Sequence, residues 1–450
     1  MNNQTLVARD LARVWHPCTQ MKDLETLPPI PFRRGEGVYL EDYDGNRYID
    51  AVSSWWVNLF GHANPRINAA IADQLEHVEH VMMAGFTHEP VIRLSEKLAE
   101  VTPEGLTRCF YADNGSSGIE AALKMSYHYW RNSGRGEKTK FIALTNSYHG
   151  ETLGALAVGD VDLFKKTYSP LLMDSIIVEG PDCFHRDEGE SWEAHSRKMF
   201  AQMEAALAEH AHEACAVIVE PLVQCAGQMR MYDPVYLELL REACDRHGVH
   251  LIADEIAVGF GRTGTMFACE QAGIAPDFMC LSKGITGGYL PLCAVVTTED
   301  VYAAFYDDFE TLRAFLHSHS YTGNPLACRA ALATIEIFET DDVIARNREL
   351  AQVLHDSLHE AFGDHPHVGD IRQHGMIGAI EMCRDGDRNQ PFPWQERRGL
   401  RVYRHGLTRG CLLRPLGNVT YFMPPYVITP DEIRHLVATA REGVDRATAD

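Results

Sequence analysis

Two ionisable residues, an acid and a lysine, each stand directly after a short apolar run. Residues 251–253 (Leu-Ile-Ala) precede Asp254, and residues 278–281 (Phe-Met-Cys-Leu) are followed by Ser282 and Lys283. A short apolar run that ends in a charge is typical of a buried strand, which delivers its polar residue at the carboxyl edge of a sheet. Ligands of open α/β sheets bind at that edge, so we expect Asp254 and Lys283 to face one ligand.

This pair suits a cofactor that needs an amine for covalent attachment and a carboxylate facing a ring nitrogen, as pyridoxal 5'-phosphate does. Two alternatives remain. In the first, Asp254 and Lys283 are ordinary solvated loop charges. In the second, residues 259–264, which spell G-F-G-R-T-G, bind the dinucleotide of a nicotinamide oxidoreductase. That motif should open a helix directly after a strand, but Asp254 and Glu255 intervene and residues 262–265 are a poor helix start.

A glycine- and serine-rich loop is a candidate anion site. It contains Gly115 and Ser116 and lies between a predicted strand (107–112) and a predicted helix (119–131). Free backbone N–H groups and the positive end of a helix attract a phosphate at such a place. Simple capping of the helix by a serine is the other interpretation, and both can hold together.

Two further loops offer contacts to a planar, phosphorylated ligand. Tyr148 follows a predicted strand (141–145), where its ring can lie flat on another ring or belong to a capped turn. The hydroxyl-rich loop 315–325 precedes a predicted helix and could complete the phosphate site. It also contains His317 and His319, but this spacing alone is a weak metal signal, and we expect no metal.

The composition is that of an ordinary globular protein of 450 residues with a net charge of −22. An acidic chain is a poor partner for nucleic acid or an anionic membrane, and an anionic substrate would need local arginines. The 12 cysteines show no C-x-x-C pair. Together with an N-terminus without an apolar signal segment, they favour the reducing cytoplasm. We find no apolar run long enough to span a membrane.

Predicted strands alternate with predicted helices from residue 107 to 338, which indicates an α/β fold with a mostly parallel, doubly wound sheet. The pattern 64–100 is helical, and Asp44-Gly45-Asn46 predicts a hairpin turn. After Phe338 the pattern changes to α+β, with a predicted strand over 411–414. We therefore expect an N-terminal segment (1–63) packed on the small domain, a large domain (64–338) and a small α+β domain (339–450).

Several motifs together resemble the class III pyridoxal-phosphate-dependent aminotransferases. The general signature is Asp254-Glu255-Ile256, the following glycines, and Ser282-Lys283-Gly284. Flanking motifs resemble those of the members of this class that act in biotin biosynthesis: Trp15-His16-Pro17, Ser53-Ser54-Trp55-Trp56, Tyr148-His149-Gly150, Ser320-Tyr321-Thr322-Gly323-Asn324-Pro325, Arg414-Pro415 and Met423-Pro424-Pro425-Tyr426. The resemblance runs from about residue 11 to the C-terminal helix and implies a fold-type I transferase.

The resemblance also implies a role for individual residues. Lys283 is the covalent anchor of the cofactor and carries a proton during the reaction, Asp254 pairs with the pyridine nitrogen, and Tyr148 stacks on the ring. The phosphate contacts implied are Gly115 and Ser116, with His319 and Ser320 of the partner subunit in a homodimer. The substrate contacts implied are Trp55, Tyr148, Lys283, Ser318, Arg414, Cys18 and Tyr421. Arg414 binds the substrate carboxylate, since a guanidinium can form two parallel hydrogen bonds to it.

The same resemblance implies the reaction. The amino acceptor is 8-amino-7-oxononanoate, the product is 7,8-diaminononanoate, and the amino donor is S-adenosylmethionine. Lysine as donor, or a broader ω-amino acid or diamine:pyruvate aminotransferase, are the alternatives. The chain departs from the pattern at Cys18, where best-known members have tyrosine, and at Glu151, where aspartate is commoner. The Cys18 difference leaves the donor open.

Overall fold

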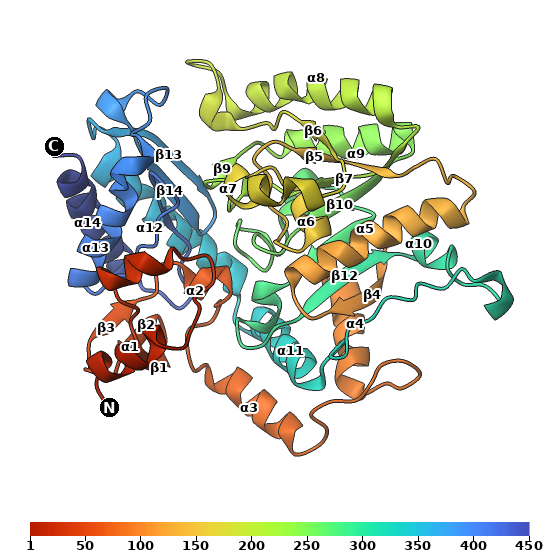
Figure 1. The fold of residues 1–450 in the computed structure, drawn as a ribbon, viewed down its shortest axis with the longest axis horizontal. Coiled ribbons are helices and arrows are strands. Elements are labelled where there is room, and N and C mark those ends of the chain that lie inside the picture. Colours follow the sequence, from red (N-terminus) through yellow and green to blue (C-terminus); the bar gives the residue numbers. More distant parts are fainter. Residues whose placement is uncertain (450) are drawn as a thin grey trace.

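The computed structural model describes residues 1–449, and a seven-stranded sheet forms its centre (Figure 1). The strand order is β4-β12-β11-β10-β7-β5-β6. All neighbours from β11 to β6 run parallel, and β12 is antiparallel to both β11 and β4. The expected α/β class with a mostly parallel sheet is therefore confirmed. The strands are β4 (Leu106–Ala112), β5 (Lys140–Leu144), β6 (Ile176–Val178), β7 (Ala214–Val219), β10 (His250–Asp254), β11 (Phe278–Leu281) and β12 (Cys293–Thr298).

The inner strands are apolar along their whole length because both faces of the sheet are covered. In β10, Leu251 and Ala253 belong to one core and Ile252 to the other. Helices α8 and α9 line the first core, and α5 and α6 line the second. The helices around the sheet are α3 (Pro65–Leu75), α4 (Glu89–Val101), α5 (Gly115–Asn132), α6 (Leu153–Ala157), α7 (Asp162–Lys165), α8 (Trp192–His210), α9 (Val235–His247), α10 (Glu299–Ala303) and α11 (Pro325–Thr340).

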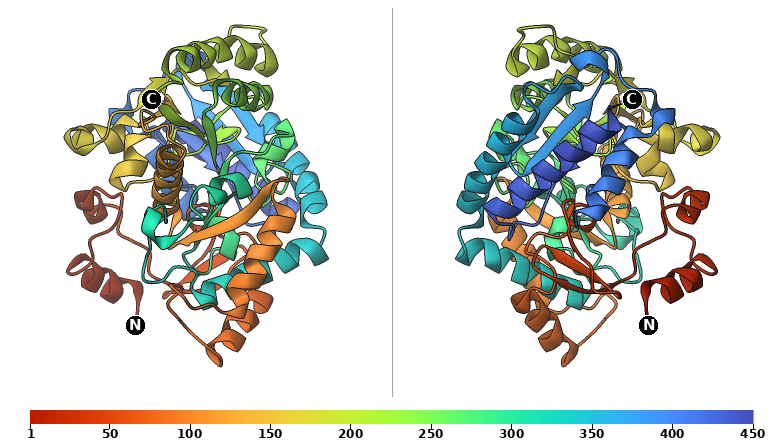
Figure 2. Two further views of the ribbon diagram at one scale, coloured as in Figure 1. Left: turned by 90° about the vertical axis from the view of Figure 1, so that its right-hand side faces the viewer. Right: turned by 90° about the vertical axis from the view of Figure 1, so that its left-hand side faces the viewer.

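The N-terminal residues and the C-terminal residues each build a three-stranded antiparallel sheet. The predicted hairpin is confirmed, with β2 and β3 joined across Asp44-Gly45-Asn46. Figure 2 shows the C-terminal helices gathered at the sheet of β13, β14 and β15. These two regions contain α1 (Asn3–Leu11), β1 (Phe32–Glu36), β2 (Tyr39–Asp42), β3 (Arg47–Ile49), α2 (Ser53–Trp56), α12 (Val343–Phe362), β13 (Val368–His374), β14 (Ile377–Met382), α13 (Arg398–Thr408), β15 (Val419–Phe422) and α14 (Pro430–Ala447). A two-stranded ribbon, β8 (Val223–Gln224) and β9 (Arg230–Met231), lies between the regions in sequence.

One local prediction holds in part and another was wrong. The helical pattern 64–100 forms two helices, α3 and α4, and residues 76–88 between them are not helical; His88 caps α4 by accepting the N–H of Val91, and Pro90 stands in its first turn. Residues 411–414 are not a strand. Only Cys411 makes a ladder contact there, a single bridge to Ile49. The domain division after Phe338 stays a proposal, and α11 ends two residues later, at Thr340.

Candidate active site

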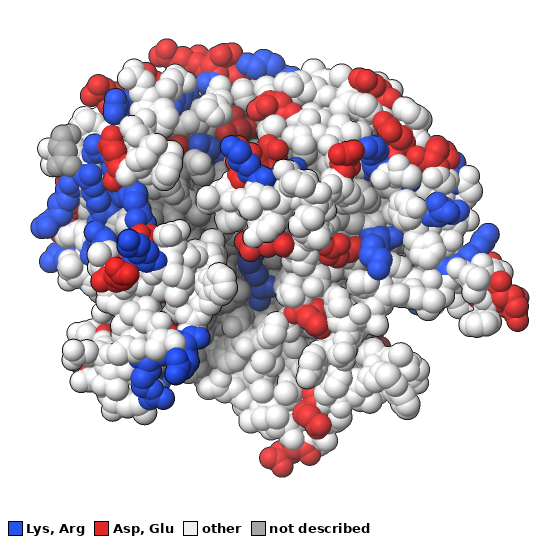
Figure 3. Space-filling view, in the orientation of Figure 1, with Lys and Arg blue, Asp and Glu red and all other residues white. Residues whose placement is uncertain are grey.

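One cavity of about 680 Å³ lies where the carboxyl ends of β7 and β10 meet α2 and the segment 414–421. Figure 3 shows this face of the molecule hollowed between the C-terminal elements and the central sheet. Most of the predicted site residues line the cavity: Cys18, Trp55, Gly115, Ser116, Tyr148, Asp254, Lys283, Arg414 and Tyr421. Residues far apart in the sequence are thus brought to one place.

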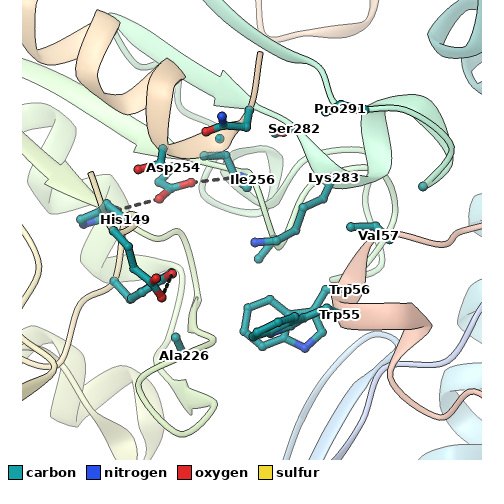
Figure 4. A pocket seen from close by; sticks show the side chains of 18 of the residues that line it. Trp55, Trp56, Val57, His149, Ala226, Asp254, Ile256, Ser282, Lys283 and Pro291 are labelled. Carbon is teal, nitrogen blue, oxygen red and sulfur yellow. Dashed lines mark hydrogen bonds and ion pairs between the residues drawn. The ribbon is translucent and has the colours of Figure 1, made fainter. Parts of the chain in front are cut away.

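Asp254, the last residue of β10, is held in a fixed orientation at the cavity wall (Figure 4). Its side chain is only 5% exposed. One carboxylate oxygen lies 2.7 Å from Nδ1 of His149, and the other accepts the N–H of Ile256 at 3.1 Å. The remaining ring nitrogen of His149, Nε2, is buried without a hydrogen-bond partner among the described residues. His149 therefore acts as an orienting partner for Asp254, a role that the sequence alone did not reveal.

Lys283 begins a 3-10 turn directly after β11 and has a left-handed backbone, with φ of 48°. Figure 4 shows its amine extending into the cavity toward the two tryptophans, and Nζ lies 4.9 Å from the centroid of the Trp56 ring. Burial lowers the pKa of Lys283, although Asp254 and Glu220 favour the charged amine. A lowered pKa increases the fraction of neutral amine, which is the form that attacks a carbonyl carbon.

The segment labelled α2 is a left-handed turn rather than an ordinary helix. Ser53, Ser54, Trp55 and Trp56 have φ values of 51°, 47°, 75° and 73°. A left-handed backbone costs an L-residue roughly 1–2 kcal/mol, so tertiary contacts must hold the turn. The Gly288 backbone packs directly on it, since a Cβ there would lie 2.8 Å from the backbone of Val57.

The left-handed turn places two indole rings beside two basic side chains, Arg414 and Lys283. The guanidinium carbon of Arg414 lies 4.1 Å from the centroid of the Trp55 ring. The Trp56 ring, which lies under Lys283, donates its Nε1–H to the hydroxyl of Tyr421 at 3.0 Å. Arg414 is thus positioned at the cavity wall with an indole ring behind it, an arrangement that suits the binding of a carboxylate.

The predicted anion site has the expected backbone, but its cap is different. Helix α5 begins at Gly115, and Asn114 caps it by accepting the N–H of Ser117 at 3.1 Å, so capping by a serine was wrong. The hydroxyl of Ser116 instead lies 2.8 Å from that of Thr152 and faces Gly150, where a Cβ would lie 2.4 Å from Ser116 Oγ. The first turn of α5 therefore presents open N–H groups to the cavity.

Tyr148 and Glu220 form a second polar wall. The Tyr148 hydroxyl donates to Glu151 at 3.0 Å, and burial raises the pKa of Tyr148, so the phenol keeps its proton. Glu220 follows β7 and accepts the N–H groups of Tyr148 and Cys225 at 2.9 and 3.0 Å. The predictions from the sequence include no role for Glu220. The available signal was an acid directly after an apolar strand, the same signal that marked Asp254.

The buried carboxyl of Glu220 makes the stability of the cofactor-free protein depend on pH. Burial, together with the nearby Asp254, raises the pKa of Glu220 to about 8, compared with 4.5 in an unfolded chain. Between these values the folded protein retains a proton that the unfolded chain loses, so the contribution of Glu220 to stability is full below pH 4.5 and is lost as pH rises through 8. We expect the Glu220→Gln variant, which has no such proton, to gain stability relative to the wild type as pH rises.

Urea unfolding of both proteins between about pH 5 and pH 9 measures this difference. The exposed Glu96→Gln variant is the matched control, and its difference from the wild type should stay constant across the range. A constant difference for Glu220→Gln as well would contradict a proton held on Glu220.

The residues of this cavity fit pyridoxal phosphate. The buried amine of Lys283 matches the aldehyde of that molecule, and the carboxylate of Asp254, oriented by His149, matches its ring nitrogen. The phenol of Tyr148 matches the ring, and the N-terminus of α5, which Gly150 approaches closely, matches the phosphate. Among residues 1–449, no three side chains of histidine, cysteine, aspartate or glutamate are grouped to hold a metal ion.

The remaining predicted residues, Ser318, His319 and Ser320, do not line the cavity of the single chain. They lie in a loop with large exposed apolar side chains, among them Leu316 at 91% exposure and Tyr321 at 62%. The cavity of the single chain therefore lacks these three predicted contacts. Within the described part of the chain, no helix is both long and apolar enough to cross a membrane.

Comparisons with known proteins relate the chain to aminotransferases. The family model described as Aminotransferase class-III matches residues 21–442. The adenosylmethionine-8-amino-7-oxononanoate aminotransferase of Helicobacter pylori is 46% identical, and the alignment covers 98% of both chains. The protein of the same name from Geobacter sulfurreducens is 42% identical, with 99% of both chains covered.

Solved structures agree with the sequence relatives. The crystal structure of the adenosylmethionine-8-amino-7-oxononanoate aminotransferase from Methanocaldococcus jannaschii has a TM-score of 0.93 and 38% identity, and covers 99% of this chain and 100% of its own. An omega transaminase from Pseudomonas jessenii in complex with PMP has a TM-score of 0.93 and 29% identity, with 99% and 98% covered.

Proposed function

This chain belongs to the class-III aminotransferase family, and we propose that it transfers an amino group to 8-amino-7-oxononanoate, giving 7,8-diaminononanoate for biotin biosynthesis. It is an aminotransferase with the fold of the fold-type I transferases, as the resemblance implied. The full-length similarity to relatives named for this acceptor supports the proposal. The single structural observation behind it is the guanidinium of Arg414 stacked on Trp55 in the same cavity as Lys283, an arrangement suited to binding a carboxylate.

Pyridoxal phosphate is the proposed cofactor, and it supplies a ring that withdraws electrons from the substrate carbon where a proton is removed and returned. Asp254, whose orientation is fixed by His149, would pair with the ring nitrogen. Lys283 would anchor the cofactor and, once free, would carry the proton, a role that its lowered pKa favours. Tyr148 would lie against the ring, and the first turn of α5 at Gly115 and Ser116 would bind the phosphate.

The substrate contacts follow from the same cavity. Arg414 binds the acceptor carboxylate, while Trp55, Tyr148, Cys18 and Tyr421 line the path between that subsite and Lys283. The Tyr148 hydroxyl donates a hydrogen bond to Glu151, and this carboxylate, which also lines the cavity, suits the positive charge that amino donors carry. The enclosed part of the cavity excludes bulk water from the reacting carbon.

We also propose a homodimer with shared sites, in which Ser318, His319 and Ser320 of one chain complete the cavity of the other. The exposed apolar side chains of Leu312, Leu316 and Tyr321, which lie in or next to the loop that carries these residues, support this arrangement. A cytoplasmic location is proposed as well. It is supported by the twelve cysteines, which all lie within the described residues and are free thiols.

The amino donor is tested by a half-reaction without acceptor. We expect S-adenosylmethionine to bleach the visible absorbance of the cofactor-loaded protein, because donation leaves the cofactor in its amine form. Lysine, putrescine and β-alanine, added separately, should act at least about tenfold more slowly, the range in which one pocket separates related substrates.

Each other outcome has a definite meaning. Bleaching by lysine alone would indicate that the amino donor is lysine, with the acceptor unchanged. Bleaching by putrescine or β-alanine, without S-adenosylmethionine or lysine, would contradict the proposed reaction and indicate a broader ω-amino acid or diamine aminotransferase. Formation of 7,8-diaminononanoate, measured by mass spectrometry after addition of the acceptor, tests the second half.

A further inference from the structure

A buried carboxylate lies beneath the left-handed turn, outside the cavity. Asp50 is 1% exposed. One of its carboxylate oxygens accepts the hydroxyl of Ser54 at 2.6 Å and lies 3.1 Å from Nε2 of His62. The other accepts the N–H of Val52 at 3.4 Å. Burial raises the pKa of Asp50, but the bonds from His62 and Ser54 outweigh burial and lower it overall, so Asp50 is charged at neutral pH.

Ser54 is one of the four left-handed residues, and its hydroxyl ties the turn to Asp50. The neighbouring Ser53 donates its hydroxyl to the carbonyl of Met423 at 2.7 Å. Arg262, a buried cation that also faces Asp50, donates to the carbonyls of Trp56 and Asn58 at 3.4 and 3.0 Å. These bonds fix the turn on both sides of Trp55, whose own side chain is 41% exposed.

The position of the Trp55 ring depends on the left-handed backbone that carries it, and the guanidinium of Arg414 stacks on this ring. The bond from Ser54 to Asp50 is one residue away from Trp55 and is charge-assisted, which makes it one of the stronger contacts of the turn. If the turn relaxes, the ring moves, and the guanidinium of Arg414 loses the surface that holds it at the cavity wall.

We infer that Asp50, through Ser54, is a positioning residue that sets Trp55, and through Trp55 the Arg414 carboxylate subsite. This inference rests on the proposed function, because that function supplies the carboxylate. His62 completes the arrangement by bonding to the same oxygen of Asp50, and Asn58 in turn lies 3.2 Å from Nδ1 of His62. The carboxylate subsite is therefore controlled by a polar network that touches neither substrate nor cofactor.

Calorimetry with nonanoate tests the inference, because this probe carries the acceptor's carboxylate and chain but has no amine or ketone. We expect Ser54→Ala, in the cofactor-loaded protein, to bind nonanoate about tenfold more weakly than the wild type, the effect of losing one charge-assisted bond. Asp50→Asn, which keeps an acceptor for Ser54 but loses the charge, should weaken binding by a smaller factor. The visible absorbance of the cofactor should be unchanged in both variants.

Two controls separate positioning from general destabilisation. Ser357→Ala removes a hydroxyl that donates to Val353 in helix α12, far in sequence from the turn, and should bind nonanoate as the wild type does. The KM for 8-amino-7-oxononanoate should rise in Ser54→Ala by the same factor as the nonanoate affinity falls, while an analogue without the carboxylate, 2-amino-3-octanone, is unaffected.

Wild-type affinity for nonanoate in both Ser54→Ala and Asp50→Asn would overturn the inference, as would a wild type that binds no nonanoate. A wild type that binds nonanoate, with weaker binding in the variants, but does not aminate the acceptor would instead refute the proposed function and leave the positioning role of Asp50 in place. The two failures are therefore distinguishable.

Discussion

Replacing Lys283 with alanine is expected to lower kcat by about 10⁴-fold or more and to remove the visible absorbance of the lysine-bound cofactor. Two roles are lost together: the covalent anchor and the group that moves the proton, and a positioned proton-transfer group alone contributes about 10²–10⁴-fold. Lys283 is the residue suited to both roles, since its amine enters the cavity beside Trp56 and its pKa is lowered by burial. Absorbance spectra and single-turnover kinetics measure the two losses separately.

The variant should still fold, because removing an amine from a buried site relieves desolvation of a charge. Lys165→Ala is the matched control. It removes a lysine that donates to the carbonyls of Ala157 and Gly159, outside the residues that line the cavity, and should retain the absorbance band. An unchanged band in Lys283→Ala would show that another residue binds the cofactor.

The Asp254→Asn variant is expected to lose about 10²–10³-fold in kcat, the usual cost of removing one preorganised electrostatic contact. Asparagine preserves the size of the side chain and an acceptor for the N–H of Ile256, but it has no negative charge to hold a proton on the ring nitrogen. The substitution also changes the contact with His149, whose Nδ1 lies 2.7 Å from the carboxylate in the wild type. Steady-state kinetics with saturating substrates reports the loss.

Asp277 provides a control for this effect, because it bonds near the beginning of β10, whereas Asp254 is the last residue of that strand. Asp277 accepts the N–H of Leu251 at 2.7 Å and pairs with Arg241, so Asp277→Asn should reduce the free energy of unfolding but leave kcat within a few-fold of the wild type. Equal losses of kcat in the two variants would mean that Asp254 acts by stabilising the fold and not by facing the cofactor.

Part of this site was predictable because strand ends are local features. The runs before Asp254 and Lys283 are entirely buried strands, and the parallel register between β10 and β11 brings their carboxyl ends to one edge. Composition and spacing were enough for this prediction. They did not exclude the dinucleotide motif, which the structure places in a turn region and not at the start of a helix.

Other features depend on tertiary contacts that no local pattern records. The left-handed turn at Ser54 is stable only because Asp50, Met423 and Arg262 hold it, and serine and tryptophan have no propensity for that backbone. Capping of α5 by Asn114 was missed because serines at adjacent positions have an equal preference for that role. The role of Glu220 was missed because an acid after a strand has many structural uses.

The central claim is that Asp254 and Lys283 bind opposite ends of one pyridoxal phosphate molecule. A crystal structure of the cofactor-loaded protein tests it most directly. We predict a covalent bond from Lys283 Nζ to the aldehyde carbon of the cofactor, with a carboxylate oxygen of Asp254 at hydrogen-bonding distance, about 2.7–2.9 Å, from the ring nitrogen. A cofactor attached to another lysine, or a ring nitrogen that faces away from Asp254, would contradict it.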